Sequence, residues 1–395
     1  MIPALRAAFN AAWTETRYQA FRHHLESRAG VPVEFPVSET PCFFPQTLMN
    51  ELAAAGEELI HQSLSGQAAR AAEAIVPDRF RGPGIESRPT FLQVDFGLVR
   101  GAGGRIEPRL VELQAFPSLY AFQTALADAY AAAFDLPAGL NRYLSGLDEP
   151  SYRALMTGAI LGGHDPAEVI LMEIEPEKQK TRPDFELTEQ FWGVRAVDTA
   201  KVVKRGRQLF SRRDGVETRI RRIYNRVIPD ELERKGVTLP FDYRDDLDVE
   251  WTGHPEWFFR ISKFSIPYLR HPSVPRTWFL HEVDALPEAR ERLLLKPLFS
   301  FAGGGIVFAP TDEQLAAIPR DERANYILQE RVLFQPVIDT PHGATQAEIR
   351  MMYVWTDTLR PVLPLVRMGR GKMMGVDHNK GLRWVGASAG MVAEG

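Results

Sequence analysis

Apolar residues recur every three or four positions through much of the first 75 residues. The stretches 3–27 and 44–64 both show this spacing, which is typical of helices with one buried face. A proline-rich stretch at 32–45 interrupts the pattern, and proline lacks the backbone donor that a continuing helix needs. The pattern predicts an N-terminal helical segment over residues 1–75.

The pattern changes to that of strands between residues 89 and 114. The stretches 90–100, "TFLQVDFGLVR", and 105–114, "RIEPRLVELQ", are separated by "GAGG". Two strand-like runs joined by a short glycine-rich link predict a hairpin. A helix is expected next, from about Ala121 to Leu136. We expect residues 76–149 to form the part of the chain that carries this hairpin.

Short strands and helices alternate over residues 150–240, with strand patterns at "EVILMEI" and "VRAVDTAKVV" and a helical pattern around 184–192. This alternation predicts an open sheet in a separate α/β subdomain. A connecting stretch rich in proline, tryptophan and histidine follows, and mixed strands are expected from 292 to 394. The last part therefore spans residues 241–395.

Composition narrows the classes of function. The chain has 395 residues, which is enough for two or three subdomains, and a formal net charge of -4, which gives no general attraction for nucleic acid or acidic membranes. Its single cysteine, Cys42, excludes an intrachain disulfide and fits a reducing compartment. The N-terminal stretch has no apolar core of a signal peptide, and no apolar run is long enough to cross a bilayer. We expect a cytoplasmic protein whose partners are small molecules.

The segment 293–308, "LLLKPLFSFAGGGIVF", carries the first candidate chemistry. Lys296 ends an apolar strand, and three consecutive glycines follow it. Glycines can present several backbone N–H groups to phosphate oxygens, and a lysine at the strand end would add a positive charge. A hairpin with a glycine-rich turn would have the same composition, so the loop alone leaves both interpretations open.

Two further segments favour a nucleotide site. "NYILQERV", residues 325–332, reads as an apolar strand that ends in polar residues, and such an edge can pair with an adenine through its backbone. Lys263 lies upstream in "RISKFSIPYLRHPSVP". Two lysines, a glycine loop and an acid at a strand edge, in this order, form a nucleotide site more readily than any one of them does.

This order of motifs resembles the ATP-grasp superfamily, and more closely its circularly permuted branch, which includes the synthetase domain of glutathionylspermidine synthase. The resemblance implies an α+β protein with a circularly permuted ATP-grasp fold, a pre-ATP-grasp-like α/β subdomain at 150–240 and the N-terminal helical segment. It implies that Lys263 and Lys296 hold the α- and β-phosphates of ATP. It also implies a covering loop and adenine and ribose contacts, at Gly303, Gly304, Gly305, Gln329, Glu330 and Val332.

ATP chemistry of this kind needs Mg²⁺, which prefers carboxylate and phosphate oxygens. If the hairpin strands pair across "GAGG", Asp95 and Glu112 come close, and Glu112 and Gln114 point to the same face. "ELQAFPSLY" also resembles the family's metal-binding segment, so Asp95, Glu112 and Gln114 are the predicted ligands. Relatives carry asparagine at the position of Gln114 and arginine at that of Gln93. Solvated acids on a strand face are the alternative.

The resemblance implies an ATP-dependent carboxylate-amine ligase, in which a small-molecule or peptide carboxylate is phosphorylated and an amine then displaces phosphate. Arg367 is the candidate for stabilising phosphate charge, together with Lys296. Two alternatives stay open: a kinase of the same fold, and a nucleotide-binding protein without turnover. The sequence assigns no role to four further polar residues, Gln179, Lys180, Arg226 and Arg370.

Overall fold

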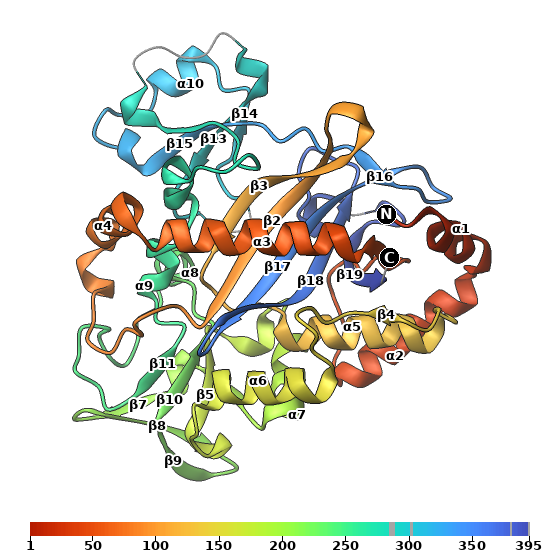
Figure 1. The fold of residues 1–395 in the computed structure, drawn as a ribbon. Coiled ribbons are helices and arrows are strands. Elements are labelled where there is room, and N and C mark those ends of the chain that lie inside the picture. Colours follow the sequence, from red (N-terminus) through yellow and green to blue (C-terminus); the bar gives the residue numbers. More distant parts are fainter. Residues whose placement is uncertain (284–288, 301–302, 380, 394–395) are drawn as a thin grey trace.

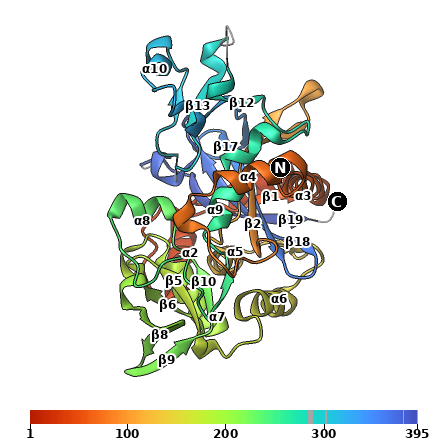
Figure 2. The ribbon, with the colours of Figure 1, turned by 90° about the vertical axis from the view of Figure 1, so that its left-hand side faces the viewer.

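The computed structural model describes residues 1–283, 289–300, 303–379 and 381–393 as a mixed α+β protein. Within these residues the strands form four sheets. In two perpendicular views the largest sheet lies at the centre, with a small antiparallel sheet at one end and a parallel sheet at the other (Figure 1, Figure 2). The fold class expected from the sequence, α+β, is confirmed.

The central sheet has the strand order β1-β19-β18-β17-β2-β3, with β16 paired to β17 and β4 to β19. All its pairs are antiparallel except β1 with β19. It therefore joins strands from both ends of the chain. The strands are β1 (Cys42–Pro45), β2 (Phe91–Arg100), β3 (Ile106–Gln114), β4 (Leu140–Asn141), β16 (Pro336–Ile338), β17 (Thr345–Trp355), β18 (Leu359–Gly369) and β19 (Gly386–Ala393).

The expected hairpin is confirmed, because β2 pairs with β3 and the partner of Asp95 is Glu112. Side chains alternate between the two faces of the sheet. Leu92, Val94 and Phe96 belong to the core between the sheet and helix α3 (Gln46–Ser63), which crosses the front of the sheet in Figure 1. The polar residue Asp95 therefore faces the other side, which α5 (Tyr120–Ala133) and α2 (Glu15–Ala29) cover in part.

The close approach of α3 to the sheet depends on Gly56. A Cβ atom there would lie 2.0 Å from the hydroxyl oxygen of Tyr353, a fully buried side chain of β17. We expect Gly56→Ala to lower the free energy of unfolding by about 1–3 kcal/mol because the helix would have to move. Gly158→Ala is the matched control, since Gly158 is an exposed helical glycine with no atom within 4 Å of its Cβ position. It should be neutral or stabilising by up to about 1 kcal/mol in the same denaturant titration.

The middle of the chain forms the open sheet that its alternating pattern predicts. Strand order is β11-β10-β5-β6, and all three pairs are parallel. Helix α7 (Arg182–Trp192) packs against β6, while α6 (Glu149–Leu161), which the sequence did not indicate, contacts α7 and β17. The strands are β5 (Val169–Glu173), β6 (Arg195–Asp198), β10 (Arg222–Asn225) and β11 (Glu250–Thr252), and beside them lie β7 (Val203–Arg205), β8 (Gln208–Arg213) and β9 (Val216–Ile220).

The small sheet has the order β12-β15-β13-β14 and is antiparallel. It lies with α10 (Asp312–Ala316) at the end of the molecule opposite the parallel sheet (Figure 1, Figure 2). Lys296 stands near the end of one of its strands, and Gln329 and Glu330 at the end of its neighbour. The strands are β12 (Thr277–Phe279), β13 (Leu293–Pro297), β14 (Val307–Phe308) and β15 (Tyr326–Glu330).

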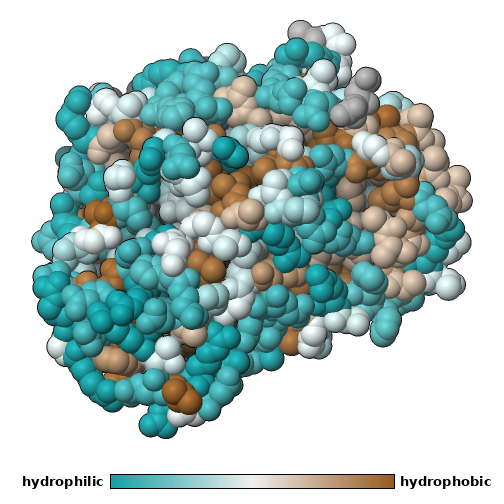
Figure 3. All heavy atoms as spheres, turned by 60° about the horizontal axis from the view of Figure 1, so that its bottom comes forward, coloured by the Kyte–Doolittle hydropathy of each residue, from teal (hydrophilic) through white to brown (hydrophobic). Residues whose placement is uncertain are grey.

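The helical N-terminal segment consists of α1 (Pro3–Ala12), α2, α3 and α4 (Gly66–Ile75). Its proline-rich break contains β1, which the sequence did not indicate because this short strand depends on pairing with β19 at the far end of the chain. The remaining helices are α8 (Pro229–Lys235) and α9 (Glu256–Arg260). The face seen in Figure 3 is mostly hydrophilic, with hydrophobic residues in scattered groups. Within the described residues, no helix is both long and apolar enough to span a bilayer.

Candidate functional site

Five charged side chains form a row across four strands on one face of the central sheet. The register sets Asp95 of β2 opposite Glu112 of β3 on one side and Arg350 of β17 on the other. Glu348 of β17 stands opposite Arg367 of β18. Because alternate residues of a strand share a face, Glu348 and Arg350 point the same way. The row joins the early hairpin to strands near the end of the chain.

Asp95 is held by both arginines of this row. Arg350 donates from Nε to Oδ1 at 2.6 Å and from Nη2 to Oδ2 at 2.7 Å, a bidentate pair. Arg367 donates to Oδ2 from Nη1 and Nη2, both at 3.2 Å. Burial alone would raise the pKa of Asp95, but the two arginines outweigh it and hold the pKa below its usual value. Asp95 is therefore an ionised, fully engaged carboxylate.

Glu348 extends this network to a second carboxylate. Its side chain accepts a close hydrogen bond from Arg367 and is 6% exposed. Burial raises the pKa of Glu348, and the attraction of Arg367 only partly offsets this. Burial also opposes the charge on Arg367, yet the facing carboxylates of Asp95 and Glu348 raise the pKa of Arg367. Arg367 thus stays charged inside the protein.

The two predicted lysines reach the same row from outside the sheet. Lys263 begins a 3₁₀ helix (Lys263–Tyr268), and its Nζ lies 3.6 Å from Glu112 Oε1 and 2.7 Å from the carbonyl oxygen of Ser300. Lys296 Nζ donates at 3.3 Å to the carbonyl oxygen of Val111, which is 185 residues away in the chain. Residues from distant segments therefore converge on one strand, β3.

A bulge in the β2/β3 pair makes this convergence possible. The register shifts between Asp95, which pairs with Glu112, and Phe96, which pairs with Leu110. Val111 is thus an extra residue on β3, and a bulged residue is left out of the regular ladder. Its carbonyl oxygen is the one that accepts from Lys296. The bulge therefore ties the small sheet to the central sheet through a lysine.

Lys296 is a buried cation with three charged neighbours. Burial lowers the pKa of Lys296 to about 8; Glu112 and Glu348 oppose this shift, while Lys263 adds to it. An anionic ligand binds better to the charged form of a lysine. The charge of Lys296 in the ligand-free protein is therefore sensitive to pH in the neutral to alkaline range.

If nucleotide phosphates bind at Lys296, as the sequence predicts, a pH dependence of nucleotide affinity follows from this pKa. Above about pH 8 the free protein must take up a proton to present Lys296 as a cation, so affinity should fall by up to about tenfold per pH unit. The measurement is a titration with a fluorescent ATP analogue from pH 6.5 to 9.5. Lys296→Arg should flatten the upper part of the profile because a guanidinium stays charged. A wild-type profile that is flat above pH 8 would contradict this assignment.

A small cavity lies beside Lys263. It has a volume of about 20 Å³, which is room for about one water molecule. Its lining combines the hairpin, the 3₁₀ helix and the strand end after Lys296, and consists of Glu112, Gln114, Phe116, Phe258, Ile261, Ser262, Lys263, Leu298 and Ser300. Glu112 and Gln114 face this cavity, whereas Asp95 is not among its lining residues.

The predicted glycine loop follows β13, and its neighbours Phe301 and Ala302 lie outside the described residues. Gly303 and Gly305 have positive φ angles of 75° and 71°, which favour glycine. A Cβ atom at Gly303 would lie 2.5 Å from Met373 Cε, and one at Gly305 would lie 2.8 Å from Pro297 Cγ. Both positions therefore favour glycine for conformation, and Gly305 favours it for space as well because the proline ring cannot move aside easily. The phosphate-covering role of Gly303, Gly304 and Gly305 stays a prediction.

The predicted adenine and ribose contacts lie at the end of β15. Gln329 is buried and donates to Thr277 Oγ1 at 3.1 Å. Glu330 lies 3.7 Å from Arg276. Val332 contacts the central sheet, since a Cβ atom on Gly97 would lie 2.9 Å from Val332 Cγ1. The segment after β15 thus bridges the two sheets, and its contacts with a nucleotide stay predictions.

The predicted metal ligands differ in what already binds them. In one orientation of its amide, Gln114 donates from Nε2 to Gln93 Oε1 at 2.7 Å. In the turned orientation, the oxygen of Gln114 instead accepts from Arg350 at 3.0 and 3.1 Å. Asp95 is engaged by two arginines, and only Glu112 combines a half-buried carboxylate with a place in the cavity. Among the described residues, no three His, Cys, Asp or Glu side chains are grouped to hold a metal ion. The metal assignment stays a prediction.

Arg226, Gln179 and Arg370, which the sequence left without a role, have partners in the structure. Arg226 donates a close hydrogen bond to the carbonyl oxygen of Pro117 and lies over the ring of Phe116, 4.8 Å from its centre. Gln179 donates to Glu231 at 3.1 Å, and the backbone N–H of Arg370 donates to Asn379. Arg226 is the one near the cavity, because Phe116 lines it.

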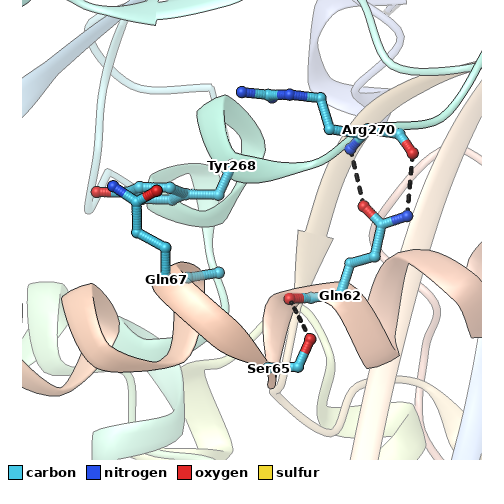
Figure 4. A pocket seen from close by; sticks show the side chains of 6 residues that line it. Gln62, Ser65, Gln67, Tyr268 and Arg270 are labelled. Atoms are coloured by element: carbon cyan, nitrogen blue, oxygen red, sulfur yellow. Dashed lines mark hydrogen bonds between the residues drawn. The ribbon is translucent and has the colours of Figure 1, made fainter.

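A second, more open pocket lies between the end of α3, the start of α4 and the segment after the 3₁₀ helix, with a volume of about 210 Å³. Gln62 bonds the backbone N–H and carbonyl oxygen of Arg270 through its amide, and Ser65 donates to the carbonyl oxygen of Gln62 (Figure 4). Neither a carboxylate nor a lysine lines this pocket. The charged row is therefore the better candidate for chemistry.

No model of a known protein family matches the chain, and no curated protein matches it in sequence. Among solved structures, a glutathione synthetase-like effector from Globodera pallida, in its apo form, superposes with a TM-score of 0.57 over 96% of both chains. The chain shares the fold of that protein. At 12% identity this likeness shows the fold alone.

Two residues of the charged row, Glu348 and Arg350, were not among the sequence-predicted site residues. "TQAEIRMMYVW" forms β17, and within it Glu348 and Arg350 stand two positions apart in an otherwise apolar run. That spacing is the signal that could have identified them, because it places both charges on one face of a central strand.

Proposed function

We propose that this protein is an ATP-dependent carboxylate-amine ligase with a circularly permuted ATP-grasp fold, which forms an amide through an acyl phosphate. The main support is the meeting of Lys263 and Lys296 with Glu112 at one strand, although long stretches of chain separate them. The fold shared with a glutathione synthetase-like protein supports the same class. Its substrates would be a small-molecule or peptide carboxylate and an amine.

The proposed roles follow from the charges of the residues in the row and beside it. In phosphoryl transfer a protein mainly positions groups and neutralises developing charge. Lys263 and Lys296 would bind the phosphates of ATP, and Arg367 would stabilise the charge at the transferred group. Gly303, Gly304 and Gly305 would close over the phosphates with backbone N–H groups. The segment from Gln329 to Val332 would contact adenine and ribose.

Mg²⁺ fits this site in part. The cavity lining includes the carboxylate of Glu112 and the amide of Gln114, whose oxygen in the turned orientation already accepts from Arg350, and nucleotide phosphates would add further oxygens. When bound there, Mg²⁺ would neutralise phosphate charge next to the lysines. Glu112 would meanwhile orient Lys263, which already lies 3.6 Å away.

Nucleotide binding on this assignment requires movement. Ligand pockets commonly have volumes of roughly 300–1,000 Å³, and the cavity beside Lys263 has only about 20 Å³. The small sheet carries Lys296 and the predicted adenine contacts, and its lysine is tied to the central sheet through a hydrogen bond to Val111. We propose that the small sheet swings away to admit ATP and then closes over it.

The acid or amine would approach from the parallel sheet. Open sheets of this kind bind ligands at the carboxyl ends of their strands. Glu173 ends β5 there, and Arg226 follows β10 and lies over Phe116 in the cavity lining. The buried carboxyl group of Glu173 could hydrogen-bond to an amine, and the buried guanidinium of Arg226 could bind an acid.

The test is release of ADP and phosphate from ATP and Mg²⁺ with a panel of acids and amines. Release that needs both an acid and an amine, with an amide detected by mass spectrometry, is the expected result. A phosphorylated product that accumulates without an amine would identify a kinase instead. Binding of ATP without turnover for any pair would indicate a nucleotide-binding protein, and a failure to bind ATP would refute all three assignments.

A further inference from the structure

Asp95 and Glu112 are cross-strand partners, yet they stand in opposite environments. Asp95 is 2% exposed, and its oxygens accept four hydrogen bonds from two guanidinium groups. The Glu112 side chain is 34% exposed, lines the cavity and forms an ion pair with Lys263 at 3.6 Å. Of the two carboxylates, only Glu112 is open to a ligand from the cavity.

The acceptor capacity of Asp95 is largely used. An ionised carboxylate offers about four lone-pair positions, and Arg350 and Arg367 bring four N–H donors to it. A divalent cation bound to Asp95 would also stand next to two guanidinium groups, which it would repel. Metal binding at Asp95 is therefore disfavoured while both arginines are in place.

Neither arginine can leave without a large rearrangement. Their side chains are 11% and 20% exposed, and Arg367 is also bound to Glu348. Moving one would strand a buried charge, and breaking a buried pair is costly because the remaining charge loses its partner. Arg350 and Arg367 thus depend on Asp95 as their shared anchor.

We infer that Asp95 acts here as a positioning residue that fixes Arg350 and Arg367 side by side, and that divalent metal binds through Glu112 without it. This inference rests on the proposed function, because it takes a nucleotide to be the ligand that binds at the cavity beside Lys263. The two guanidinium groups thus occupy the carboxylate oxygens at which a metal would otherwise bind Asp95. Part of the nucleotide affinity is then independent of metal.

The first experiment measures Mn²⁺ binding by electron spin resonance in the presence of a non-hydrolysable ATP analogue. Asp95→Asn should change Mn²⁺ affinity by less than about threefold, since the substituted group does not touch the metal. Glu112→Gln should weaken it by more than about tenfold. Equal losses in the two variants would overturn the inference, because both residues would then behave as ligands.

The second experiment measures the affinity for the same analogue in EDTA, that is, without metal. A purely structural role of Asp95 would leave this metal-free affinity unchanged. Asp95→Asn should weaken metal-free binding by about tenfold because the arginines lose their anchor. Glu112→Gln should leave it equal or tighter, since a carboxylate near the phosphates is neutralised. Unchanged metal-free binding in Asp95→Asn, with Mn²⁺ affinity also lost, would overturn the inference.

Asp95→Asn leaves two buried arginines with less compensation and could fail to fold. The double variant Asp95→Asn/Arg350→Gln removes one of them, and it should keep Mn²⁺ affinity within about threefold of wild type. A loss beyond tenfold in a folded double variant would overturn the inference. Failure of the proposed function gives a different result, because the wild-type protein itself would then bind no nucleotide. In that case the role of Asp95 in holding the arginines is tested by melting temperatures. The changes caused by Asp95→Asn alone and by Arg350→Gln alone must not add up to the change in the double variant.

Discussion

Lys296→Met should reduce ATP-dependent turnover by a factor on the order of 10²–10³, corresponding to about 3–4 kcal/mol of lost transition-state stabilisation. Methionine keeps most of the length of the side chain and removes its charge. Lys296 is buried, and its Nζ reaches the carbonyl oxygen of Val111 beside the cavity. Among the groups near the proposed phosphate site, it is the cation that the small sheet contributes. Steady-state assays at saturating acid and amine provide the measurement.

The same substitution should leave the fold intact. Burial lowers the pKa of Lys296 to about 8, so its charge is held in the protein at a cost, and removing the charge removes that cost. The melting temperature of Lys296→Met should therefore equal or exceed that of wild type. Lys201→Met serves as the matched control, since Lys201 is an exposed lysine of the parallel-sheet region and should change neither turnover nor stability. Wild-type turnover in Lys296→Met would remove this lysine from the site.

The hairpin shows what local pattern can establish. Alternation in "FLQVDFGLVR" and "IEPRLVELQ" and the glycine-rich link were enough to predict β2, β3 and the closeness of Asp95 to Glu112. The pattern could not reveal the bulge at Val111, because a bulge depends on which strand pairs where. It also could not reveal that β17 would lie on the other side of β2, which places Arg350 against Asp95.

Pairing between distant strands accounts for the other contacts of the site that the sequence did not predict. Arg367 was predicted to face phosphate, and in the structure it contacts Asp95 and Glu348. Its partners lie on β2 and β17, and neither contact follows from the sequence near Arg367. The strand β1 is a similar case, since "CFFP" becomes a strand by pairing with β19. Local periodicity predicts elements well, whereas the charge state of a buried site depends on contacts between elements.

Glu173→Gln should stabilise the protein at alkaline pH, and the gain should grow with pH. Glu173 is 3% exposed at the end of β5, and burial, only partly offset by Arg226, raises the pKa of Glu173 from 4.5 to about 8. A raised carboxyl pKa means that the folded protein favours the protonated form. The contribution of protonated Glu173 to the free energy of unfolding is fully present below pH 4.5. It is lost as pH rises from 4.5 through about 8. Over that range the loss is on the order of 3–5 kcal/mol.

Urea titrations of wild type and Glu173→Gln at several pH values between 5 and 8.5 test this expectation. Glutamine keeps an oxygen that can accept the 2.7 Å hydrogen bond from the backbone N–H of Ile174 and cannot ionise. The difference in unfolding midpoint should be small at pH 5 and largest at pH 8.5. Glu177→Gln is the matched control, because Glu177 is exposed four residues further along and should give a small, constant difference. A constant difference for Glu173→Gln would mean that Glu173 ionises normally. A difference that grows with pH would show that the ionised Glu173 beside Arg226 destabilises the folded protein. Such a cost in stability is expected where buried polar groups bind a ligand.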